Sequence, residues 1–379
     1  MNNKYDIIFI GLGLSNSLIA LSLLKTNLKI LIIEERKKIN SNHIWSFFKF
    51  NIFYNKNNYI KNLIYNQWNK YTIKFPNNIY NFKNGYFCIK SNIFYKYLFK
   101  KLKHNLLLNT RVKKYSKNYI KLKNGNFLYC DLIIDGSGYY PNLNELIGLQ
   151  LFLGQEWLFK KSHNLKFPII MDSTLYQEMG FNFIYVIPLS KFKLLIEDTY
   201  YINNKILKLN LLRNNIFKYI KKNKWVIKRI IREEYGIIPI KLKKTKKKKF
   251  KNIILNGLRG ELYNLTTGYS INISLKLSNN ILKINHINCK KILNEFNKLS
   301  KKIYNKQKFY ILLNAIFFLF IKPNKRYKLI QSFYNLPKSL INRFYLKKIN
   351  FLDIIKIITL KPQFSYFKIL CFIINYYFI

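Results

Sequence analysis

The stretch "YDIIFIGLGLSNSLIALSLLK" (5–25) constrains the fold of this chain more than any other part of the sequence. An apolar run of strand length leads into Gly11 and Gly13, and leucines then recur at helical spacing. Gly11 permits a tight turn, and Gly13 lets the backbone approach a pyrophosphate at the helix N-terminus. Asn16 stands in the place of a third glycine, and we expect it at the same site.

A second apolar run, "LKILIIEE" (28–35), follows the helical segment and ends at Glu34. Strand, glycine turn, helix, strand and acid in this order predict a dinucleotide-binding unit, in which Glu34 accepts hydrogen bonds from the adenosine ribose. The alternative is an ordinary βαβ unit whose glycines serve packing alone.

Two more glycine turns follow apolar strands, in "DLIIDGSGYYP" (131–141) and "IILNGLRGELYNLTTGYSINIS" (253–274). Three such turns, widely separated along the chain, fit a discontinuous flavin-binding domain better than an NAD domain, whose halves run consecutively. The residues of these later turns that we expect at the nucleotide are Asp135, Gly136, Gly257, Thr267 and Gly268.

The chain is strongly basic, with a net charge of +51 from 67 Lys and Arg and 16 Asp and Glu residues. Such a charge suits nucleic acid or an anionic membrane. However, the basic residues are spread along the whole length, and no nucleic-acid-binding motif accompanies them. We therefore expect no nucleic-acid partner, and keep a basic nucleic-acid-binding protein as the alternative of another class. The dense run "KLKKTKKKKF" (241–250) is expected to be a solvated loop.

The four cysteines and four histidines show no metal or redox spacing, so we expect no metal site. We expect no signal peptide, because the first residues run directly into an expected strand. No apolar stretch reaches the roughly 20 residues of a membrane span. The late apolar runs at 311–321 and 367–379 are typical of buried helices, and partial insertion into one leaflet is the alternative.

Several further motifs stand in one order along the chain: "NHIWSF" (42–47), "IDGSGY" (134–139), "GQEW" (154–157), "LLIEDTYY" (194–201), "REEYGIIPI" (232–240), "GLRGELYNLTTGYS" (257–270) and "FYNLP" (333–337). With these motifs the chain resembles the bacterial-type lycopene β-cyclases over nearly its entire length. The resemblance implies an α/β, Rossmann-like FAD-binding flavoprotein fold, with an antiparallel-sheet substrate domain and a mostly helical C-terminal region. The expected FAD-binding domain is discontinuous (1–50, 110–150 and 250–290), the substrate-binding domain takes 51–109 and 151–249, and the helical region takes 291–379.

The activity that the resemblance implies is a redox-neutral, acid-catalysed cyclisation of the ψ-ends of lycopene to β-rings, giving γ-carotene and then β-carotene. The enzyme would be an isomerase (an intramolecular lyase) that uses reduced FAD, with NAD(P)H as the reductant. We expect a cytoplasmic protein that associates peripherally with the membrane and meets other carotenoid-pathway enzymes. A flavin-dependent isoprenoid reductase or hydroxylase on the same fold is the alternative.

Protonating an alkene requires a carboxylic acid that stays protonated, which burial and a neighbouring carboxylate both favour. Glu197 and Asp198 end an apolar run, and adjacent side chains of an extended segment point to opposite faces. Only one can face a pocket, and the resemblance points to Glu197, which leaves Asp198 to hold the local backbone. Glu156 and Asp172 are further catalytic candidates.

A carbocation needs electron density without a nucleophile, which aromatic faces supply. The aromatics in the motifs that the family places around its pocket are Trp45, Trp157, Phe183 and Tyr185, for which core packing is the alternative. The chain departs from the family pattern around the expected flavin site at Ser137, Glu261, Asn264 and Leu265. Because a carboxylate repels a pyrophosphate, we expect Glu261 either to weaken flavin binding or to point to solvent.

Overall fold

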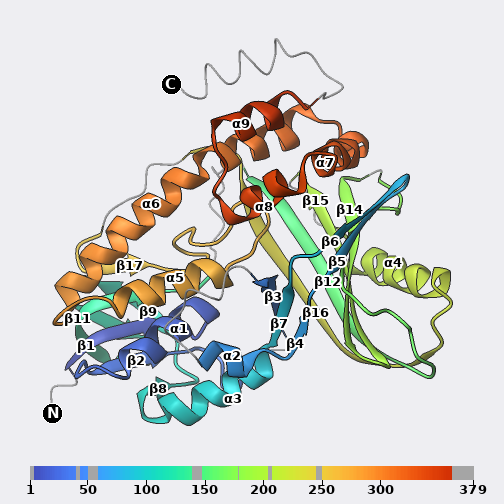
Figure 1. The fold of residues 1–379 in the computed structure, drawn as a ribbon. Coiled ribbons are helices and arrows are strands. Elements are labelled where there is room, and N and C mark those ends of the chain that lie inside the picture. The colour runs from blue at the N-terminus through green and yellow to red at the C-terminus, as the bar shows by residue number, and fades with distance from the viewer. Residues whose placement is uncertain are drawn as a thin grey trace.

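The computed structural model describes residues 4–39, 43–49, 59–138, 147–177, 179–203, 207–244 and 250–360. Two large sheets stand side by side with a small sheet between them (Figure 1). Helices from the C-terminal part of the chain lie along one side of these sheets. The apolar run at 367–379 lies outside the described residues.

The first sheet has the strand order β8-β2-β1-β11-β10-β9. In addition, β17 pairs with residues 133–135 at the C-terminal end of β11. Its central strands are parallel and buried on both faces, which explains their continuous apolar runs. The sheet confirms the predicted βαβ unit, in which α1 (Leu14–Leu23) joins β1 to β2. Its strands are β1 (Lys4–Ile10), β2 (Ile30–Ile33), β8 (Leu106–Leu107), β9 (Val112–Ser116), β10 (Tyr119–Leu122), β11 (Phe127–Asp135) and β17 (Ile253–Leu255).

Helices pack on this sheet and share its core. They include α1, α3 (Ser91–Leu102), α5 (Ile271–Ile281) and the long helix α6 (Cys289–Ala315), with short helices at α2 (Tyr59–Leu63) and Lys103–Asn105. The strand β8 pairs with β2, although its residues fall in the range expected for the substrate-binding domain.

The second sheet has the order β16-β12-β15-β14-β13-β5-β6, and all its pairs are antiparallel except β13 with β5. Helix α4 (Leu209–Lys222) covers one face, and an aromatic core covers the other. Its strands are β5 (Tyr71–Phe75), β6 (Asn78–Phe82), β12 (Ile147–Phe159), β13 (Ile169–Asp172), β14 (Phe181–Ser190), β15 (Lys193–Ile202) and β16 (Ile227–Lys241).

The small sheet β3-β7-β4 lies between the two large ones (Figure 1). Its strands are β3 (Ile44–Phe48), β4 (Asn66–Trp68) and β7 (Tyr86–Lys90). Beyond α6 come a π-helical turn (Ile316–Phe320), a 3-10 turn (Pro323–Lys325), α7 (Arg326–Tyr334), α8 (Lys338–Leu346) and α9 (Phe351–Ile358). The expected helical C-terminal region is therefore present.

The structure confirms the expected burial of one apolar run and corrects the expectation of a solvated loop for the basic run. The apolar run at 311–321 is mostly core, because Ile311, Leu312 and Phe318 are each at most 2% exposed. The basic run at 241–250 begins inside the fold, since Lys241 ends β16 and is 5% exposed. Residues 245–249 lie outside the described ranges. Within those ranges, no helix is both long enough and apolar enough to cross a bilayer.

Candidate active site

Three glycine turns meet at one edge of the first sheet. The parallel strands β1, β11 and β17 end in register at Ile10, Asp135 and Leu255, and each runs directly into its turn. Gly11 has φ +85°, and a Cβ there would lie 3.0 Å from the carbonyl oxygen of Gly136. Because ligands of open α/β sheets bind outside the carboxyl ends of the strands, this edge is the expected nucleotide site.

Asn16 ties these turns together. Its Nδ2 donates to the carbonyl oxygens of Ile10 and Gly11, each at 2.9 Å, and its Oδ1 accepts from Asn256 Nδ2 at 2.8 Å. A Cβ on Gly136 would lie 2.6 Å from Asn16 Nδ2, so the amide fills the space that this glycine leaves. The residue in place of the third glycine therefore fixes the positions of the three turns relative to one another.

Glu34 and Asp135 are buried acids at this edge. Glu34 accepts from the backbone N–H of Leu12 at 2.8 Å and from Arg36 Nε at 2.7 Å. Burial alone would raise the pKa of Glu34, but these hydrogen bonds and the Arg36 charge outweigh it and hold the pKa below its ordinary value. Glu34 is thus an ionised acceptor, as a ribose hydroxyl requires. Asp135 accepts from Tyr115 OH at 2.6 Å and from the backbone N–H of Ser137 at 3.0 Å, which shapes the second turn.

The "TTGYS" segment places unsatisfied polar atoms in the interior. The hydroxyl oxygens of Thr266 and Thr267, and Oδ1 of Asn272 in the first turn of α5, are buried with no hydrogen-bond partner among the described residues. Buried polar groups normally have partners, so this cluster fits a polar ligand. Helix α1 begins after Gly13 with no acidic residue in its first turn, which favours a phosphate there. These features fit a flavin dinucleotide.

The departures from the family pattern have local explanations. Glu261 forms an ion pair with Lys241, so its charge is compensated and it does not extend freely into solvent. Ser137 Oγ donates to Asp135 Oδ1 at 2.5 Å. Asn264 Oδ1 accepts from the backbone N–H of Thr266 at 3.1 Å. Leu265 is fully buried beside Tyr263 and Ile311.

Glu197 and Asp198 point to opposite faces of the second sheet. Asp198 faces α4, where its carboxylate oxygens accept from Asn182 Nδ2 at 2.5 Å and Asn215 Nδ2 at 2.8 Å. Burial raises the pKa of Asp198 to about 7 against the lowering effect of these amides. Asp172 also faces α4 and accepts from Tyr219 OH at 2.8 Å. Asp172 and Asp198 therefore lie on the face of the sheet opposite to the Glu197 side chain.

Glu197 lies on the other face, directly opposite Tyr185 on β14 and Gly154 on β12. Its Oε1 accepts from Thr199 Oγ1 at 3.0 Å. Burial raises the pKa of Glu197 to about 8, and the nearby Glu234 carboxylate adds to this effect. At neutral pH Glu197 is therefore predominantly a protonated acid.

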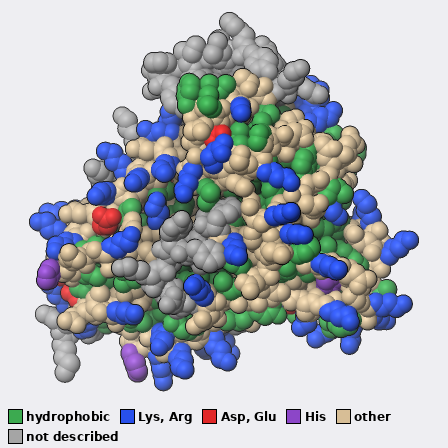
Figure 2. Space-filling model, viewed as in Figure 1, with side chains coloured by type: hydrophobic (Ala, Val, Ile, Leu, Met, Phe, Trp, Pro, Cys, Tyr) green, Lys and Arg blue, Asp and Glu red, His purple; other side chains and the backbone are tan. Residues whose placement is uncertain are grey.

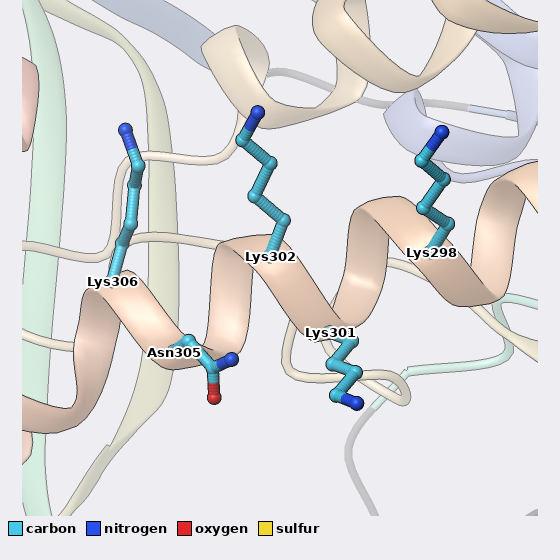
Figure 3. A pocket seen from close by; sticks show the side chains of 5 residues that line it. All are labelled: Lys298, Lys301, Lys302, Asn305 and Lys306. Atoms are coloured by element: carbon cyan, nitrogen blue, oxygen red, sulfur yellow. The ribbon is translucent and has the colours of Figure 1, made fainter.

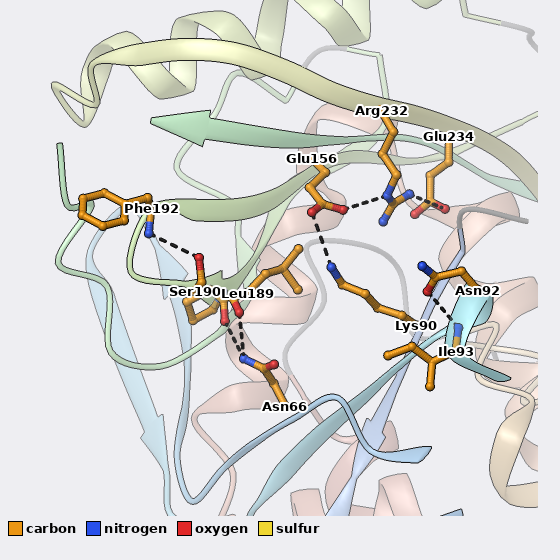
Figure 4. A network of polar contacts seen from close by, with 11 residues as sticks. Asn66, Lys90, Asn92, Ile93, Glu156, Leu189, Ser190, Phe192, Arg232 and Glu234 are labelled. Carbon is orange, nitrogen blue, oxygen red and sulfur yellow. Dashed lines mark hydrogen bonds and ion pairs between the residues drawn. The ribbon is translucent and has the colours of Figure 1, made fainter. Parts of the chain in front are cut away.

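Glu156 shares this face but has a different environment (Figure 4). Its oxygens accept from Arg232 Nε at 2.9 Å and Lys90 Nζ at 3.4 Å. The same Arg232 reaches Glu234, with its Nη1 3.3 Å from Oε2. His43 Nδ1 lies 3.0 Å from that same oxygen. Glu156 and Glu234 are thus ion-paired, whereas Glu197 has a hydroxyl partner.

Glu234 is a further acid on the Glu197 face, and its sequence motif did not mark it as a site residue. It belongs to "REEYG", and its approach to Glu197 depends on how β12, β15 and β16 pair. The alternation of β16 was the available signal, because it places Arg232 and Glu234 on one face and Glu233 on the other. Glu233 accordingly pairs with Arg213 of α4, at 2.6 Å.

The four expected aromatics are divided among different surroundings. Tyr185 and Phe183 lie on the Glu197 face, in the aromatic core. Tyr185 OH lies 2.9 Å from Tyr86 OH, and burial raises its pKa well above its ordinary value, so it is a neutral phenol. Trp157 packs with the core on the α4 face. Trp45 packs edge-on against Phe94 of α3, with ring centroids 5.4 Å apart.

A surface hollow on α6 has unsuitable chemistry for a hydrocarbon. Figure 3 shows Lys298, Lys302 and Lys306 pointing to one side of the helix, while Lys301 and Asn305 point to the other. This hollow is distinct from the carboxyl cluster, which lies on the second sheet.

Comparison with known proteins decides the family. A family model described as "Lycopene cyclase protein" matches residues 6–371. The chain belongs to the lycopene cyclase family. This lycopene cyclase family member is 34% identical over 366 residues to "Lycopene beta-cyclase" of Pantoea ananas, covering 96% of both chains. It is 32% identical to "Lycopene beta-cyclase" of Pseudescherichia vulneris, covering 94% of both.

Solved structures show that the fold of this family member is the expected flavoprotein type. A geranylgeranyl bacteriochlorophyll reductase-like protein of Thermoplasma acidophilum matches with a TM-score of 0.66 at 15% identity, covering 99% of this chain and 100% of that one. HpxO of Klebsiella pneumoniae, solved with FAD, matches with a TM-score of 0.64 at 9% identity, covering 90% and 99%. The likeness supports the Rossmann-like part, the antiparallel sheet and the helical C-terminal region together.

The raised pKa of Glu197 predicts a pH-dependent contribution to stability. Between its ordinary pKa of 4.5 and about 8, the folded state binds the Glu197 proton more tightly than the unfolded state. The stabilisation is complete below this window and is lost as pH rises through it. Urea unfolding at several pH values should therefore show the parent losing stability relative to Glu197→Gln, by at most about 1.4 kcal/mol per pH unit. Glu35→Gln, at a side chain that is 66% exposed, is the control and should show no such trend. A difference between parent and Glu197→Gln that is constant across the window would contradict the assignment.

Proposed function

We propose that this protein is a lycopene β-cyclase, an isomerase of the intramolecular-lyase class that closes the ψ-ends of lycopene into β-rings, giving γ-carotene and then β-carotene. The observation that carries the proposal is Glu197, a partly buried acid whose pKa burial raises to about 8, on a sheet face lined with aromatics. The proposal is also supported by the 34% sequence identity to a protein named lycopene beta-cyclase.

In this reaction the protonated Glu197 gives its proton to the terminal alkene of a ψ-end. The ring closes through a tertiary carbocation, and a ring carbon then returns one proton to the carboxylate. The product is an isomer of the substrate, so no net oxidant or reductant is consumed. The faces of Tyr185 and Phe183 would stabilise the cation, at roughly 0.5–2 kcal/mol for each well-placed ring.

We propose FAD as the cofactor, held at the edge where the glycine turns meet. The glycine turns, the ionised Glu34 and the unpartnered hydroxyls of Thr266 and Thr267 support this assignment. Bound in its reduced form, with NAD(P)H as the reductant, the flavin would supply electron density that stabilises positive charge without net electron transfer. The residues that we propose to contact it are Gly11, Gly13, Asn16, Glu34, Asp135, Gly136, Gly257, Thr267 and Gly268.

The division of labour follows the two large sheets. We propose that the first sheet and its helices bind FAD, and that the aromatic face of the second sheet receives the carotenoid. Glu156, held by Arg232 and Lys90, would balance their charge rather than act as the acid. Asp172 and Asp198, which face α4, would stabilise the sheet that carries Glu197.

A hydrocarbon of this size enters from a membrane, and α9 offers a surface for peripheral association. Phe351 is 74% exposed, Leu352 66% and Ile355 42%, and the exposed Lys348 and Lys356 lie in or beside the helix. In Figure 2 hydrophobic side chains gather at the top of the view, over α9, and Lys and Arg side chains are spread over the rest of that face. Apolar anchors flanked by lysines suit an anionic lipid surface.

Glu197→Gln should abolish cyclisation while leaving flavin bound. The amide matches the carboxyl in size but has no acidic proton, and losing an acid–base group costs about 10²–10⁴-fold in rate. Pigments from lycopene-accumulating cells that express each variant provide the measurement. Glu156→Gln is the matched control and should retain part of its turnover. Product mass also separates the alternatives, because cyclisation leaves it unchanged, reduction adds two hydrogens and hydroxylation adds oxygen. Near-normal turnover by Glu197→Gln with a dead Glu156→Gln would move the proton donor to "GQEW".

Purified protein should bind FAD and turn over only after the flavin is reduced, by dithionite or NAD(P)H. Gly11→Ala should lose flavin absorbance, since it strains a turn at φ +85° and brings a methyl group against Gly136. Gly125→Ala is the matched control, because Gly125 also has a positive φ (+95°) but lies in a hairpin turn with open space around it. Full activity of protein stripped of flavin would refute the cofactor assignment.

Phe351→Glu combined with Leu352→Glu should weaken binding to phosphatidylglycerol vesicles by about tenfold or more. Burying each such side chain contributes about 1.5–3 kcal/mol, which the charged replacement removes. Ile79→Glu is the control, because Ile79 is 65% exposed on β6 and lies outside α9. Co-sedimentation with anionic and neutral vesicles, at low and high salt, measures the effect. Equal binding by both variants would show that α9 is not the contact surface.

A further inference from the structure

Gly154 lies between two carboxyl groups on neighbouring strands. It belongs to β12, where it faces Glu197 of β15 on one side and Glu234 of β16 on the other. A Cβ at Gly154 would lie 3.3 Å from Glu234 Oε1 and 3.5 Å from Glu197 Oε2. Glycine within a strand often marks a place where other groups approach closely. The two carboxyl groups therefore occupy the same space above this glycine.

The surroundings of the two carboxyl groups are unequal. Glu234 has a positive partner in Arg232, at 3.3 Å, and His43 lies 3.0 Å away. Glu197 has the hydroxyl of Thr199 at 3.0 Å. Two carboxylates that share a site resist ionising together, and the one with the better cationic partner keeps the charge. The proton of the pair therefore resides on Glu197.

Other titratable groups near Glu197 do not reverse this order. Tyr185 and Tyr201, on the same face, are phenols whose pKa burial raises, so both are neutral. Asp198 faces α4, on the opposite side of the sheet. On the Glu197 face, Glu156 is already engaged by Arg232 and by Lys90 of β7.

We propose that Glu197 and Glu234 act as an acid–carboxylate pair across Gly154, in which Glu234 is a positioning residue that keeps Glu197 protonated. The inference rests on the proposed function. It identifies the group that keeps the proposed proton donor protonated. When Glu197 gives its proton to an alkene carbon, a new C–H bond forms and the pair carries two negative charges opposite the carbocation. Loss of a ring proton back to Glu197 restores the starting state, so protons and charge balance without a co-reactant.

The test compares pH profiles of cyclisation in reconstituted holoenzyme. Glu234→Gln removes the charge that opposes ionisation of Glu197, so the alkaline limb should move to lower pH by about one unit or more. Activity at the parent's alkaline midpoint should then fall several-fold, while activity in mild acid is largely retained. A purely structural role would lower activity by the same factor at every pH. Glu233→Gln is the matched control, because Glu233 is the sequence neighbour of Glu234 but pairs with Arg213 on the opposite face.

Gly154→Ala provides an independent variant, since its methyl group would intrude on both carboxyl groups. The alkaline limb of the Gly154→Ala pH profile should also move to lower pH. This variant tests the pair if circular dichroism shows that Glu234→Gln does not fold. An alkaline limb that does not move in the folded variants overturns the pair, while an inactive Glu197→Gln would still support the proposed function. An active Glu197→Gln would instead refute the proposed function itself.

Discussion

The pairing of β12 with β15 and β16 is the constraint on which the proposed active site depends. This register brings Glu156, Glu197 and Glu234 to one face from three separate strands. A shift of one residue in any of these strands would turn its acid toward α4. The core between the sheet and α4, where Leu212 and Ile216 are fully buried, holds the register in place. The chemistry of the site is thus secured by apolar packing on the opposite face.

Carboxyl groups of this chain serve different purposes because their partners differ. Glu34 is buried but remains ionised, since Arg36 and the backbone N–H of Leu12 compensate its charge. Glu156 is held by two cationic side chains. Glu197 has a hydroxyl partner and a neighbouring carboxylate, so burial and repulsion both favour its neutral form. The fold therefore holds carboxyl groups that serve binding and charge balance as well as an acid able to release a proton.

Sequence patterns predicted the parts of the molecule that depend on local order. The glycine turns at Gly11, Gly136 and Gly257 follow parallel strands, as their spacing indicated, and alternation correctly separated Glu197 from Asp198. The approach of Glu234 to Glu197 could not be predicted in the same way, because it requires the register of three strands and the absence of a side chain at Gly154.

The sheet face on which Asp172 lies could not be predicted from the sequence either. A strand end shows that a side chain is near a boundary, but it does not identify the face. In the structure Asp172 faces Tyr219 of α4. Composition was also misleading for the basic run that begins at Lys241. It predicted a solvent-exposed loop, whereas the first lysine of the run pairs with Glu261 in the interior.

Infrared spectroscopy can determine whether Glu197 carries a proton at neutral pH. Parent and Glu197→Gln holoenzyme, each with and without ¹³C-labelled glutamate, would be compared at about pH 7. A protonated Glu197 should give a carbonyl band of a carboxylic acid that shifts with the glutamate label and is missing from the variant. If the variant loses only ionised carboxylate bands, Glu197 is not the protonated acid of the site.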